Sequence, residues 1–140
     1  MGPQFEPIEG AEGWQVSNPP VLSTAPLLAS LDIFRRAGIE RLREKSISLT
    51  AYMQRLVTGL LPGAVEIVTP PAAQDRGCQL SLRLAMPAPE AKRCHERRTA
   101  AGVIGDWREP DVLRLAPVPL YNSYSEVFAA VEALARAVRS

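Results

Sequence analysis

The chain has 140 residues, of which 46% are hydrophobic and 22% charged, so it fits a single domain with an ordinary core. A formal net charge of +1 and an aromatic content of 6% argue against binding to nucleic acid or to an anionic membrane surface. Two cysteines in unrelated contexts, Cys78 and Cys94, with the single His95, do not make a metal cluster, and we expect buried reduced thiols that suit the cytoplasm.

The first 20 residues are expected to form an extended arm. They read MGPQFEPIEGAEGWQVSNPP, rich in glycine and proline, with no sustained period and no signal-peptide pattern. A compact domain rarely begins with such a segment, which suggests that something precedes it. No apolar run approaches the length of about 20 residues that a membrane span needs.

Two helices are predicted next. The first has Thr24 as its N-cap, Pro26 in its first turn and Gly38 at its end. The second ends at Gly59, Pro62 and Gly63, and its apolar stripe alternates at spacings of four and three: Leu42, Ser46, Leu49, Met53, Leu56 and Leu60.

In the remaining chain, the pattern of apolar residues changes to a period of two, which is typical of strands. VEIVT (65–69) and the alternating CQLSLRLA (78–85) predict strands, and a third helix is expected over about 89–100. VIGDW (103–107) and VLRLA (112–116) predict two more strands, joined by the turn REPD. Ser123 and Glu126 form a capping box that opens a last helix.

The element order is therefore α-α-β-β-α-β-β-α. Such an order favours an α+β fold, a two-layer sandwich of a small antiparallel or mixed sheet with helices on one face. We expect two parts: an arm over 1–20 and a small domain over 21–140.

Most residues that could carry chemistry are expected on solvated surfaces. His95, the arginine pairs at 35–36 and 97–98, Lys45 and Lys92 all lie in polar helical stretches. No motif for a serine nucleophile, a phosphate loop or a zinc protease occurs.

Solvation on the surface does not explain three other positions in the sequence. Arg114 lies within an apolar strand and requires an anion, either a neighbouring Asp or Glu or a bound carboxylate. Asn18, held extended by the two prolines after it, is either a turn residue or an amide directed at a ligand. Arg76 and Gly77 at a strand entry form either a turn or part of a site.

Five stretches resemble the C-terminal part of kynureninase, in that family's order and spacing. They are GWQVSNPP (13–20), ASLDIF (29–34), LREKSISLT (42–50), RGCQLSL (76–82) and DVLRLAPVPLYNSYSEV (111–127). The resemblance runs from about Phe5 to the end of the chain. It implies the small domain of a pyridoxal 5'-phosphate enzyme of the aspartate-aminotransferase fold type.

The resemblance also implies an activity. Kynureninases hydrolyse L-kynurenine or 3-hydroxykynurenine to anthranilate or 3-hydroxyanthranilate and L-alanine, in tryptophan catabolism and NAD synthesis. They are cytoplasmic homodimers with active sites at the subunit interface. The resemblance leaves the choice between the two substrates open.

Two residues of this chain match the family's site. Arg114 matches the arginine that binds the substrate's α-carboxylate, and Asn18 matches the asparagine that reaches the cofactor and substrate from the partner subunit. Trp14, beside it, is expected only to pack. The family's Schiff-base lysine and the other cofactor-binding groups match nothing here, so we expect no catalytic residue, and chemistry that needs that lysine cannot proceed.

The chain is thus expected to be a fragment, inactive alone: a truncated gene, a late start or half of a split enzyme with a separately encoded large domain. The alternative is a stand-alone, non-catalytic binding or assembly module that keeps the small-domain fold.

Overall fold

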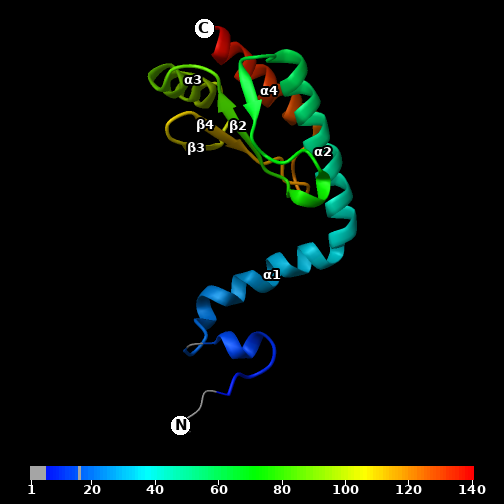
Figure 1. Ribbon diagram of the computed structural model, residues 1–140. Helices are drawn as coiled ribbons and strands as arrows, with labels where there is room; N and C mark the ends of the chain where they lie inside the picture. The colour runs from blue at the N-terminus through cyan, green and yellow to red at the C-terminus, as the bar shows by residue number, and fades with distance from the viewer. Residues whose placement is uncertain (1–5, 16) are drawn as a thin grey trace. The chain divides into compact units, whose positions relative to one another are not determined.

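The computed structural model describes residues 6–15 and 17–140 of the chain (Figure 1). Two compact units make it up, Met1–Gly38 and Ile39–Ser140, and each is described by itself. The predicted division into an arm over 1–20 and a domain over 21–140 stays a prediction. Expectations that fall on residues 1–5 and 16 lie outside the described residues.

The first unit contains a short 3-10 helix, Ala11–Trp14, and α1, Val21–Ala37. The prediction of Thr24 as the N-cap is wrong, because the helix begins earlier, after Pro20. The Thr24 hydroxyl donates to the Pro20 carbonyl at 3.1 Å. Gly38 ends α1 with a φ of +81°, a conformation that glycine adopts without strain. None of the residues of α1 is buried, and its apolar side chains are exposed: Val21, Leu22, Leu27, Leu28, Leu31, Ile33 and Phe34.

The second unit begins with α2, Ile39–Leu60. The first four members of its predicted stripe are buried, whereas Leu60 is 41% exposed. Thr50 and Val57 are buried instead, because a straight helix with 3.6 residues per turn drifts from a strict four-three pattern. Among the described residues, no helix is both long and apolar enough to cross a bilayer.

Four strands of the described chain form an antiparallel sheet in the order β1-β2-β4-β3. The strands are β1, Val65–Ile67; β2, Leu80–Leu84; β3, Asp106–Arg108; and β4, Val112–Leu115. Because side chains alternate along a strand, one face of the sheet is apolar and enters the core: Leu80, Leu82, Leu84, Leu113 and Leu115.

Three helices cover that apolar face: α2, α3 (Ala88–Ala100) and α4 (Tyr124–Arg139). α2 and α4 pack side by side along the sheet (Figure 1). The capping box of α4 is confirmed, because the Glu126 amide donates to the Ser123 hydroxyl and the Glu126 carboxylate accepts from the Ser123 amide. The predicted α+β fold and element order are therefore confirmed.

The opposite face of the sheet, which we call the open face, carries the alternate side chains. Arg114 lies between Ser81 of β2 and Asp106 of β3 in the strand register. Arg83, next to Glu66 of β1, and Arg108 lie on the same face. The open face is thus polar and rich in guanidinium groups.

Candidate functional site

Arg114 has an anion beside it on the open face. Its Nε donates to Asp106 Oδ2 at 2.5 Å, and its Nη2 lies 2.5 Å from the same oxygen. The Arg114 side chain remains 32% exposed. The predicted need for an anion is confirmed, with Asp106 as the neighbouring carboxylate; the role of Arg114 toward a ligand stays a prediction.

Asp106 serves two arginines. Its Oδ2 also accepts from Arg108 Nε at 2.9 Å. The hydrogen bond from Arg114, with the charges of both guanidinium groups, holds the pKa of Asp106 below its usual value, so this carboxyl is ionised at neutral pH. Two cations sharing one anion leave local positive charge on the open face, which favours an anionic ligand.

The segment after β4 makes one bond to α2 and one bond within itself. Lys45 of α2 donates to the Pro119 carbonyl at 2.7 Å, and the Val118 amide donates to Asn122 Oδ1 at 2.8 Å. Lys45 is therefore half-buried and structural, not a solvated surface lysine as predicted. These bonds fix the chain a few residues beyond Arg114.

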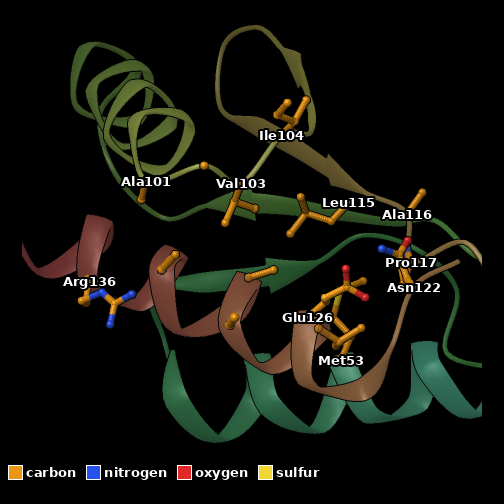
Figure 2. Close-up of a pocket in the computed structure, with 15 residues that line it drawn as sticks. Met53, Ala101, Val103, Ile104, Leu115, Ala116, Pro117, Asn122, Glu126 and Arg136 are labelled. Atoms are coloured by element: carbon orange, nitrogen blue, oxygen red, sulfur yellow. The ribbon is translucent and has the colours of Figure 1, made fainter.

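A cavity of about 410 Å³ lies between α4 and the two segments that precede β3 and follow β4. Figure 2 shows Val103 and Leu115 directed toward α4, from which Glu126 projects. Six of its fifteen lining residues are alanine or glycine: Ala101, Gly102, Ala116, Ala129, Ala130 and Ala133. The carboxylate of Glu126 is engaged in the capping box, and bonding to Ser123 lowers its pKa, so it is not available as a general acid.

The fully buried arginine of this fold is Arg98 of α3, not Arg114. Its exposure is 0%, so the prediction of a solvated pair at 97–98 is wrong for this residue. Nη1 donates to the Val103 carbonyl at 2.9 Å, and Nη2 lies 2.8 Å from His95 Nδ1. Burial lowers its pKa. Arg98 thus ties the segment that leads into β3 to α3.

His95 is not a solvated histidine either. Its ring stacks on Trp107 of β3, with centroids 5.2 Å apart and an interplanar angle of 21°. Because a guanidinium can only donate, the bond from Arg98 requires Nδ1 to be an unprotonated acceptor, which places the ring proton on Nε2. Burial and the charge of Arg98 lower the pKa of His95, against smaller raising effects of Glu96 and Asp106.

We expect stability to fall as the solution is acidified toward pH 5. The folded-state pKa of His95 lies below its usual value of 6.5, so between the two values the unfolded chain binds more protons. The stabilisation is complete above pH 6.5 and is lost as the pH falls through the folded pKa. Urea unfolding from pH 7.5 to 5 should show this fall, and His95→Gln should reduce it. An equal pH dependence in both proteins would contradict the role of this chain's only histidine.

The other sequence-predicted residues have separate surroundings. Asn18 is exposed in the irregular segment before α1 and borders a shallow hollow with Glu12 and Gln15. Trp14 is 87% exposed within the described chain, and its expected packing role stays a prediction. Arg76 donates to Gln54 Oε1 at 2.9 Å, so it tethers the β1–β2 connector to α2. Asn18 and Arg114 belong to different units.

Pyridoxal phosphate does not fit the described residues as a covalently held group. Its attachment needs a lysine, and Lys45 is committed to Pro119, whereas Lys92 is exposed on the surface of α3. Both cysteines are free; Cys94 is buried, and desolvation raises its pKa, so it is a poor nucleophile. Among the described residues, no three His, Cys, Asp or Glu side chains gather to hold a metal ion.

Comparison with known proteins agrees with the sequence resemblance. The profile of the kynureninase C-terminal domain matches residues 42–134. The kynureninases of Stenotrophomonas maltophilia (strain K279a) and Xanthomonas euvesicatoria pv. vesicatoria (strain 85-10) are each 54% identical over 132 residues, which is 94% of this chain. A kynureninase of Xanthomonas oryzae pv. oryzae is 54% identical over 127 residues. The chain spans 31% of the length of the first two relatives.

Proposed function

The chain belongs to the kynureninase C-terminal domain family, and we propose that it is the segment of a kynureninase that binds the substrate's α-carboxylate through Arg114. One observation carries this proposal: Asp106 occupies only the Nε–Nη2 edge of Arg114, on an open, positively charged face of the sheet. A guanidinium presented in this way matches a carboxylate in geometry and charge.

The reaction we propose for the complete enzyme is hydrolysis of L-kynurenine or 3-hydroxykynurenine to an anthranilate and L-alanine. Pyridoxal 5'-phosphate, bound by the rest of that enzyme, supplies the electron sink for this chemistry. We place the complete enzyme in the cytoplasm as a homodimer, in which Asn18 contributes to the cofactor and substrate site. In this proposal the chain contributes binding and orientation.

The apolar side chains of α1 support a role within a larger assembly. Leu22 and Leu28 are among seven large apolar residues of this helix that the chain leaves in solvent. An exposed apolar helix face of this kind is typical of an interaction surface. It argues against the alternative of a stand-alone binding module, which would be expected to bury that face.

The isolated 140-residue chain is expected to show no kynurenine hydrolysis and no yellow cofactor adduct. The reason is that neither of its lysines is placed to hold the cofactor. A full-length hybrid, in which this chain replaces the matching C-terminal segment of the Stenotrophomonas maltophilia enzyme, is expected to be active. Both proteins are assayed for anthranilate release and for cofactor absorbance.

Two results would contradict the proposal. Turnover by the isolated chain would mean that its own residues perform the chemistry. A hybrid that is dimeric, loaded with cofactor and inactive would mean that the segment cannot serve a kynureninase site. The parent enzyme, expressed in parallel, is the matched control for loading and assembly.

A further inference from the structure

The bond between Arg114 and Asp106 uses one edge of the guanidinium. Asp106 Oδ2 lies 2.5 Å from both Nε and Nη2, and so within the fork that these two nitrogens form. A guanidinium has five N–H donors, and this contact engages one on each of two nitrogens. Within the described residues, Nη1 has no interaction.

The remaining donors lie together on the other edge. One N–H of Nη2 and both of Nη1 point away from Asp106, in the geometry that a second carboxylate accepts with two parallel hydrogen bonds. Arg114 can thus hold Asp106 by its side and a ligand by its end at the same time. The internal salt bridge and the ligand site are not alternatives in this arrangement.

Asp106 itself is held in place by its strand. It lies opposite Arg114 in the β3–β4 register, and the next residue, Trp107, stacks on His95 of α3. Arg98 fixes the chain just before β3 through the Val103 carbonyl. A carboxylate on so restrained a strand can define the direction of a flexible arginine side chain.

We propose that Asp106 is a positioning residue for Arg114: it clamps the Nε–Nη2 edge so that the Nη1–Nη2 edge is preset for the substrate's α-carboxylate. This inference rests on the proposed function and adds a second residue to it. Asp106 does not touch the substrate; it spares Arg114 the loss of side-chain freedom that binding would otherwise require.

The test uses the full-length hybrid with Asp106→Ala and Asp106→Asn. For L-kynurenine, the alanine variant is expected to raise KM about tenfold while kcat changes less than about threefold. The asparagine variant should fall between it and the parent, because the amide oxygen can still accept from Nε. The second probe is the decarboxylated analogue of L-kynurenine, used as a competitive inhibitor. Because it lacks the α-carboxylate, its Ki should not change in either variant.

Glu66→Gln is the matched control. Glu66 pairs with Arg83 at 2.9 Å on the same face, so its loss removes a comparable salt bridge without touching Arg114, and KM should stay at the parent value. Thermal unfolding of each variant checks folding. If Asp106→Ala does not fold, Asp106→Asn replaces it in the test, with the same measurements of KM and Ki.

Two outcomes would overturn the inference. An unchanged KM in the Asp106 variants overturns it, and so does an equal weakening of substrate and decarboxylated inhibitor, which would indicate a general structural defect. If Arg114→Ala also leaves KM unchanged, the proposed function fails with it. An Arg114→Ala defect alongside normal Asp106 variants overturns only the role of Asp106.

Discussion

Arg114→Ala in the full-length hybrid is expected to lower kcat/KM for kynurenine by about 100- to 1,000-fold. Removing one partner of a hydrogen-bonded charge pair costs about 2–5 kcal/mol, and each 1.36 kcal/mol is a factor of ten. The loss should appear mainly as a raised KM, because the carboxylate is bound in the ground state as well as in the transition state. Steady-state kinetics over a wide range of kynurenine concentration measure both constants.

Arg114→Lys separates charge from shape. Lysine keeps the positive charge but lacks the planar fork, so it cannot hold Asp106 and a ligand on two edges, and we expect a defect close to that of alanine. Arg83→Ala is the control, because Arg83 is an arginine of the same face that pairs with Glu66. Kinetics of Arg114→Ala within threefold of the parent would remove Arg114 from the substrate site.

The element order could be predicted because the main local signals agreed with the final packing, although some boundaries did not. The alternation of β2 survives as the burial pattern of Leu80, Leu82 and Leu84, and the capping box at Ser123 marks the start of α4 within one residue. The predicted N-terminus of α1 was wrong because both Pro20 and Thr24 are residues that can precede a helix. Local propensity did not separate those two starting points.

Arg98 escaped prediction because its neighbours are charged. The stretch RCHERR reads as solvated, yet Ala91, Cys94 and Arg98 recur at spacings of three and four and form the buried face of α3. That spacing is the signal that could have identified a buried arginine. Its charge alone predicted that Arg98 would be exposed to solvent, because arginine is rarely buried without a paired anion.

Asp106 was missed because its partner depends on strand register. A four-residue turn, REPD, would place Asp106 opposite Leu113, whereas the structure includes Arg108 in β3 and so pairs Asp106 with Arg114. A one-residue shift moves a side chain to the other face of a sheet. The anion that Arg114 requires could be inferred from the sequence, but not its identity.

Gly105→Ala is expected to destabilise the fold by about 3 kcal/mol. A Cβ at this position would lie 2.6 Å from Leu115 Cδ2, 2.8 Å from Arg98 Nη1 and 2.9 Å from the Arg114 carbonyl oxygen. The carbonyl belongs to the β4 backbone and cannot move aside, and Arg98 is buried and bonded, so the strand must shift. Urea unfolding should show a lower midpoint with an unchanged slope.

The same substitution links stability to the proposed site. Gly105 precedes Asp106, so a displaced β3 should misplace that carboxylate and raise KM in the full-length hybrid, whereas a purely global loss of stability would leave the folded enzyme's KM intact. Gly59→Ala is the matched control: its Cβ meets nothing within 4 Å in α2, and alanine should stabilise the helix by about 0.5–1 kcal/mol. Equal stability of the two variants would contradict the close packing between Gly105 and β4.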